Sequence, residues 1–127
     1  MIIVLIHWRI KPTSEAEAAF FEFWKNQAKI LDKTQLIGEF LSAPMPATDF
    51  PFKVDDLSES HSNGMCKHFI NVGVWKSWNG FNEQVGRYMN DSNPMLEFEA
   101  ERRTRTVLDP RHWRIGNSHL PIESTCE

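Results

Sequence analysis

The chain has 127 residues, of which 41% are hydrophobic and 24% charged, and its formal net charge is −3 at pH 7. This length fits one domain with its own core, so we interpret residues 1–127 as a single domain. A negative net charge argues against a nucleic-acid-binding protein, which needs a basic surface to displace counterions from phosphates.

Nine Phe, five Trp and one Tyr are many for this length and favour a large pocket or an apolar interface. No run approaches the roughly 18 consecutive apolar residues of a membrane span, and the apolar run 1–6 lacks the basic leader of a signal peptide. We therefore expect a cytoplasmic protein without membrane contact. The two cysteines, Cys66 and Cys126, are predicted to be free thiols.

The first two elements are a strand and a helix. Residues 2–11 alternate two largely apolar faces, which predicts a strand covered on both sides at its start. After Pro12, a capping Thr13 or Ser14 opens a helix that we expect to reach about Asp32. Its wide apolar stripe consists of Ala16, Phe20, Phe23, Trp24, Ala28 and Leu31.

A second strand is predicted over 35–42, with Gly38 as a bulge or a close-packing point. Residues 43–64 contain three prolines and a polar end and match no regular element. A connection of this length is typical of a lid, a binding loop or an insertion, which we place at about 44–64.

The stretch from Lys67 to Met89 joins a strand directly to a helix. Strand alternation places Phe69, Asn71, Gly73 and Trp75 on one face and Ile70, Val72 and Val74 on the other. Ser77 is a suitable N-cap. The helical stripe that follows it consists of Trp78, Phe81, Val85, Tyr88 and Met89.

Turn residues 90–94 end this helix, and Pro94 predicts a short further helix through Phe98. A last strand is predicted over 102–108, with its arginines at an edge or in a polar pocket wall. The C-terminal extension, about 109–127, is expected to lie across a surface.

This order of elements predicts an α+β, ferredoxin-like βαββαβ sandwich, with a four-stranded antiparallel sheet and helices on one face. The core spans about 2–108. Because both sheet faces carry apolar residues, we expect a homodimer that buries the second face.

The chain resembles the antibiotic biosynthesis monooxygenase family of the dimeric α+β barrel superfamily. The resemblance covers most of residues 2–108 and rests on the element order, on Asn71-x-x-x-Trp75-x-Ser77 with Phe81, and on the terminal strand. It implies that Asn71 and Trp75 assist oxygenation of a polycyclic phenol without metal or flavin. The long insertion and the C-terminal extension depart from the family pattern. The heme-degrading branch uses a histidine on the helix after this strand, and residues 80–88 contain none.

Such oxygenation needs an electron-rich aromatic or polyketide-type substrate that itself reduces dioxygen, while the protein orients and deprotonates it. Asn71 is suited to donate to an oxyanion and Trp75 to stack on a flat substrate. Either His7 or His68 is a candidate base, so the catalytic candidates are Asn71, Trp75, His7 and His68. The substrate-binding candidates are Trp24, Phe81, Arg103 and Arg105.

Each assignment has a structural alternative. Trp75 fits a core position, Asn71 a buried amide that satisfies a neighbour, and the arginines a solvated edge. The spacing of the histidines and cysteines matches no closed metal site, so we predict no metal and no cofactor. The alternative functions are a module that binds a small hydrophobic ligand without catalysis, and a protein whose sheet face only dimerises.

Overall fold

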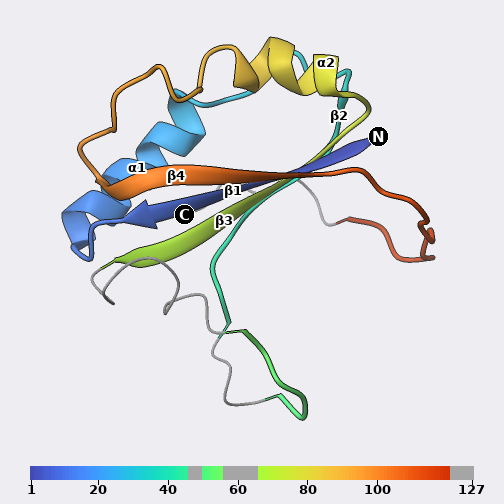
Figure 1. Cartoon of the computed structure of the whole chain (residues 1–127), viewed down its shortest axis with the longest axis horizontal. Coiled ribbons are helices and arrows are strands. Elements are labelled where there is room, and N and C mark those ends of the chain that lie inside the picture. Colours follow the sequence, from blue (N-terminus) through green and yellow to red (C-terminus); the bar gives the residue numbers. More distant parts are fainter. Residues whose placement is uncertain (46–49, 56–65, 121–127) are drawn as a thin grey trace.

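The structure is a computed structural model that describes residues 1–45, 50–55 and 66–120. Its elements are β1 (Ile2–Ile10), α1 (Ser14–Asn26), β2 (Leu36–Ser42), β3 (Lys67–Trp75), α2 (Trp78–Phe81), the π-helical turn η3 (Asn82–Gly86) and β4 (Glu99–Leu108). The strands form one antiparallel sheet in the order β2-β3-β1-β4. The helices lie on one side of this sheet (Figure 1). The predicted α+β class is confirmed, and the arrangement is consistent with a ferredoxin-like fold.

An aromatic core joins α1 to the sheet. The Trp8 ring of β1 lies 5.1 Å from the Phe20 ring of α1, and Phe20 also contacts Phe69 of β3. Phe98, just before β4, packs against the same cluster. Phe20 is fully buried, so its ring is a central contact between helix and sheet.

The alternation predicted for β3 is confirmed. Phe69, Asn71 and Trp75 are buried toward the helices, whereas the intervening residues are only half-buried. β1 pairs with β3 so that Ile6 is opposite Asn71 and Ile2 is opposite Trp75. The helix-covered face is therefore the core face of the sheet.

The other side of the sheet, which we call the open face, has none of the described helices over it (Figure 1). Phe40 on β2 and Leu108 on β4 are 40% and 43% exposed. The half-buried apolar residues between them are Ile3, Leu5, Ile70, Val72 and Val74. Within the described residues, this face is apolar in the middle and incompletely covered.

The helices are shorter than predicted. α1 ends at Asn26 because the Ala28 N–H bonds back to the Phe23 carbonyl at 2.9 Å, a six-residue closure typical of a helix C-terminus. Leu31 is consequently 81% exposed rather than part of the helix stripe. The Ser77 hydroxyl caps α2 by accepting from the Gly80 N–H at 3.1 Å, as predicted. The predicted continuous stripe is wrong beyond it, because the chain widens into η3 and leaves Tyr88 61% exposed.

The other connections differ in detail. The register of β2 shifts between Leu36 and Gly38, where a bulge was one of the two predicted features. The helix predicted after Pro94 is absent, because Leu96 and Glu99 close a turn and β4 begins at Glu99. The described parts of the insertion, 44–45 and 50–55, and of the extension, 109–120, contain no helix or strand. In the described part of the chain, no helix has the length and apolarity needed to cross a bilayer.

Candidate functional site

A buried amide links three elements on the helix-covered face. The Trp24 indole N–H of α1 donates to Asn71 Oδ1 at 3.2 Å, and Asn71 Nδ2 donates to Glu39 Oε1 of β2 at 2.9 Å. An indole N–H can only donate, so the orientation of the Asn71 amide is fixed by this contact. Asn71 is 4% exposed. Trp24, Asn71 and Glu39 are called the amide triad below.

Glu39 is the titratable member of the amide triad. Desolvation raises the pKa of its carboxyl above the ordinary value of 4.5, and the Asn71 hydrogen bond and the Lys33 charge offset part of that rise. Because this residue is half-buried, one end of the triad borders solvent. A carboxylate whose pKa is raised is a stronger base than that of an ordinary surface glutamate.

Trp75 and Phe81 lie side by side at the junction of β3 and α2. Their rings meet edge to face, with centroids 5.8 Å apart. Trp75 is 1% exposed and Phe81 3% exposed. The indole also lies over Gly73, where a Cβ atom would come within 2.9 Å of the Trp75 Nε1. The structure therefore places both rings in the hydrophobic core.

Both candidate arginines are held in ion pairs. Arg103 Nη1 lies 2.8 Å from Glu99 Oε2, with both side chains almost fully buried, and its guanidinium lies 5.1 Å from the Trp8 ring centre. Arg105 Nη1 lies 2.9 Å from Asp91 Oδ1, and its Nη2 donates to the Met89 carbonyl at 2.6 Å. The Arg105 contacts tie β4 to the segment that precedes it, whereas the Arg103–Glu99 pair lies within β4.

His7 and His68 are brought together, but on the opposite side of the sheet from Asn71. His7 Nε2 lies 2.8 Å from His68 Nδ1. His7 is paired with Ile70 and His68 with Arg9 in the β1–β3 register. The four catalytic candidates therefore divide into two pairs that the sheet separates.

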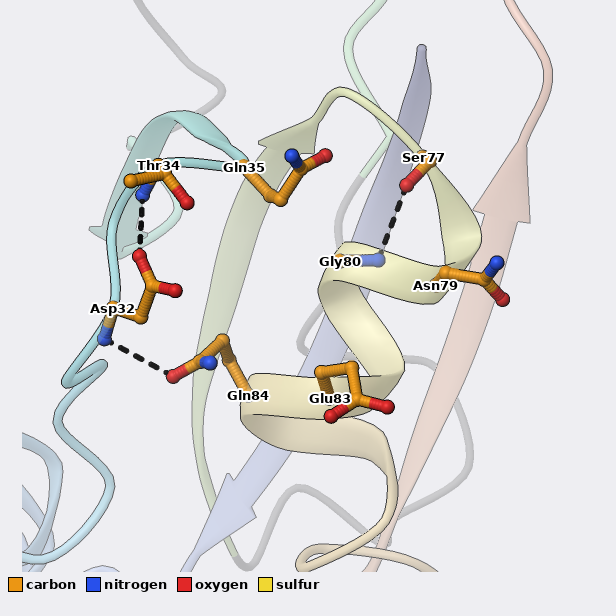
Figure 2. Close-up of a pocket in the computed structure, with 8 residues that line it drawn as sticks. All are labelled: Asp32, Thr34, Gln35, Ser77, Asn79, Gly80, Glu83 and Gln84. Carbon is orange, nitrogen blue, oxygen red and sulfur yellow. Dashed lines mark hydrogen bonds between the residues drawn. The ribbon is translucent and has the colours of Figure 1, made fainter.

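Two surface hollows are formed by described residues. The first, of about 460 Å³, lies between the 32–35 loop and the start of α2 (Figure 2), where Asp32 accepts from the Thr34 N–H at 3.0 Å. That hydrogen bond lowers the pKa of Asp32. The second, of about 360 Å³, lies at the start of β3 beside α1. Neither hollow has Asn71 or Trp75 in its wall.

Among the residues described, no three His, Cys, Asp or Glu side chains are grouped so that they could hold a metal ion. His61, one of the histidines weighed for metal binding, and Cys126 lie outside the described residues, whereas Cys66 is described and half-buried. No protein-family model matches the chain, and no curated protein matches it either.

Sequence reasoning missed Glu39. The signal was present, because Glu39 is an acidic residue between Gly38 and Phe40 in an otherwise apolar strand. Ordinary alternation would have placed Phe40 inward and Glu39 outward, or the reverse, according to how the bulge at Gly38 is set. The register of the sheet places Glu39 opposite Gly73 and turns it toward Asn71.

Proposed function

We propose that the protein is a homodimeric enzyme that resembles the antibiotic biosynthesis monooxygenases and oxygenates an electron-rich aromatic or polyketide-type molecule without a cofactor. The observation that supports it is the amide triad: an amide donor beside a carboxyl of raised pKa, under a helix rich in aromatic side chains. Oxygenation without a cofactor needs a base and a hydrogen-bond donor for the negative oxygen, and the amide triad contains both kinds of group.

Glu39 is the base in this proposal. Its carboxylate takes a proton from an anthrone-type CH₂ group or its phenol, and the resulting carbanion or phenolate is reactive toward dioxygen. Asn71 has a second N–H on Nδ2 with which to stabilise the negative oxygen. Addition of O₂ gives a hydroperoxide, and loss of water from it leaves a ketone, so one CH₂ group and one O₂ become one C=O group and one H₂O.

The homodimer is the second part of the proposal. The open face presents half-buried aliphatic side chains in its middle, and a second copy of the same face is the simplest apolar surface to cover it. The exposed residues Trp113 and Ile115 of the extension, at 63% and 86%, add apolar surface beyond β4.

Oxygen uptake by the purified protein with an anthrone-type phenol tests the reaction. Glu39→Gln keeps the size of the side chain and removes the base, so the rate should fall about a hundredfold or more. Asn71→Ala should lower it by about a hundredfold through loss of the oxyanion donor. Glu22→Gln, an exposed position on α1, is the matched control. Uptake that does not respond to Glu39→Gln and Asn71→Ala would reject the assigned roles.

A module that binds a small hydrophobic ligand is the alternative. It is favoured by the ion pairs of Arg103 and Arg105, which engage both guanidinium groups within the protein, and by the burial of Trp75 in the core. Native mass spectrometry that shows a co-purified aromatic ligand, with no oxygen uptake, would support this alternative over the enzyme.

A further inference from the structure

Four polar side chains form a chain of contacts. Three of them lie on β1 and β3, and the fourth is the thiol of Cys66. Arg9 Nη2 lies 3.2 Å from His7 Nδ1, and His7 Nε2 lies 2.8 Å from His68 Nδ1. His68 Nε2 lies 3.3 Å from the Cys66 Sγ. We call these four residues the thiol relay.

Arg9 fixes the first hydrogen bond of the thiol relay, because a guanidinium only donates and His7 Nδ1 must therefore accept. With both imidazoles neutral, the His7 proton lies on Nε2 and is donated to His68 Nδ1, which places the His68 proton on Nε2. In this arrangement the His68 N–H donates to the Cys66 sulfur.

The relay is also anchored. Arg9 is 3% exposed, its Nη1 donates to Thr104 Oγ1 at 3.1 Å, and its Nε lies 3.5 Å from Glu101 Oε2. His68 is 6% exposed. Contacts with β4 hold Arg9, and His68 is part of β3. The His68 Nε2–H group is therefore directed at the Cys66 sulfur before any reaction begins.

Cys66 lies in the wall of the second hollow, of about 360 Å³, at the end of the sheet beside α1. The Lys67 ammonium is in the same wall and lies 2.6 Å from the Glu17 carboxylate. The apolar part of the wall is formed by Ala43, Pro44 and Phe69. A half-buried sulfur, an imidazole and a cation thus all line this hollow.

We propose that Cys66 is a nucleophilic thiol that reduces hydroperoxides in this hollow. The sulfur, as thiolate, attacks the nearer peroxide oxygen, so an S–O bond forms and the O–O bond breaks. The cysteine is oxidised to a sulfenic acid, and the hydroperoxide ROOH is reduced to ROH as the leaving oxygen takes a proton from solvent. The His68 N–H stabilises the negative sulfur, and the Lys67 ammonium stabilises the leaving oxygen.

A hydroperoxide is favoured over an acyl group as the substrate, because it needs fewer hydrogen-bond donors from the site. Peroxide reduction needs a nucleophilic sulfur and one donor for the departing oxygen, and both are in the wall of the hollow. An acyl group would need in addition a pair of donors directed at its carbonyl oxygen. The relay lies on the other side of the sheet from the amide triad, so this proposal stands apart from the oxygenase.

The test measures sulfenic acid formation at Cys66 with hydrogen peroxide, trapped by dimedone and quantified by mass spectrometry at pH 7 without any phenolic substrate. The full chain carries Cys126→Ser, so Cys66 is its one thiol. We expect a second-order rate constant at least about tenfold above that of glutathione, as expected for one charge-assisted hydrogen bond to sulfur. A rate at or below that of glutathione would overturn the proposal, and this comparison requires no further variant.

Two variants test the relay. His68→Phe keeps a ring of similar size and removes the N–H, so the rate should fall about tenfold. His68→Gln retains a side-chain N–H donor and should recover most of that loss. An unchanged rate in His68→Phe would refute the role of the relay, and rapid alkylation by iodoacetamide with slow peroxide oxidation would refute the choice of hydroperoxide.

Discussion

The two faces of the sheet differ in how much of their large apolar side chains is exposed. On the helix-covered face, large apolar side chains such as Trp8 and Phe20 are at most 2% exposed. On the open face, apolar side chains of comparable size, such as Phe40, remain 40% exposed. The first face packs against the described helices, and the second is the face that the proposed homodimer would cover.

Polar groups differ between the faces as well. The amide triad and the Arg103–Glu99 pair are short arrangements on the helix-covered face, in which Asn71, Arg103 and Glu99 are buried. The thiol relay instead runs along the strands to a hollow at the end of the sheet. On the helix-covered face, the polar side chains of the amide triad thus link α1, β2 and β3. On the open face, the polar side chains direct a hydrogen bond toward the Cys66 sulfur.

The largest contrast is expected from matched phenylalanine truncations. Phe20→Ala leaves a cavity in the core and should lower the free energy of unfolding by about 3–5 kcal/mol. Phe40→Ala, on the open face, should cost about 1 kcal/mol or less in the isolated subunit. Urea unfolding at low protein concentration measures both. Equal losses would remove the distinction between the faces.

Breaking the buried ion pair should have a similar effect. Arg103→Met leaves the fully buried Glu99 carboxylate without its cation and should cost about 3–5 kcal/mol. The backbone N–H groups of Leu96 and Arg103 still donate to that carboxylate. Arg105→Met is the control, because its partner Asp91 is exposed and the loss should stay near 1 kcal/mol or below. Urea unfolding that ranks the two variants in the opposite order contradicts this assignment.

A charge introduced on the open face should weaken the proposed homodimer. Val72 lies in the middle of that face, opposite Leu5. In the proposed dimer, Val72→Asp would bury two like charges and should weaken association by several kcal/mol, about a hundredfold or more in the dissociation constant. Sedimentation equilibrium measures it, with the exposed Glu22→Gln as control. A wild-type protein that is monomeric at high concentration would rule out this use of the face.

The smallest effect concerns pH. The native pKa of Glu39 lies above its ordinary value, so the folded protein binds more protons than the unfolded chain between those two values. Stability should therefore fall as pH rises from about 4.5 through the raised native pKa, and level off above it. In Glu39→Gln this fall should disappear. Superimposable curves of unfolding free energy against pH for the two proteins would show that Glu39 titrates normally.

The sheet was predictable because period-two alternation in β1 and β3 requires only local information. The lengths of the helices were not, because the closure at Phe23 and Ala28 and the widening at η3 depend on tertiary contacts that a 3.6-residue period does not contain. The same holds for the site. Asn71 was identified from its strand position, but the partnership with Glu39 depends on a register irregularity at Gly38, and the direction of the His7–His68 pair depends on Arg9.

Gly73 sets a limit on how much room the interior can offer near the amide triad. Any side chain there would meet the Trp75 indole, so the ring keeps its present place only while residue 73 has no Cβ. Alanine at this position would force the indole to shift, and Phe81 packs against that ring. A single methyl group at residue 73 is thus enough to change the packing of the Trp75 ring over β3. Substitution at this position is therefore a way to alter the shape of the interior next to the amide triad.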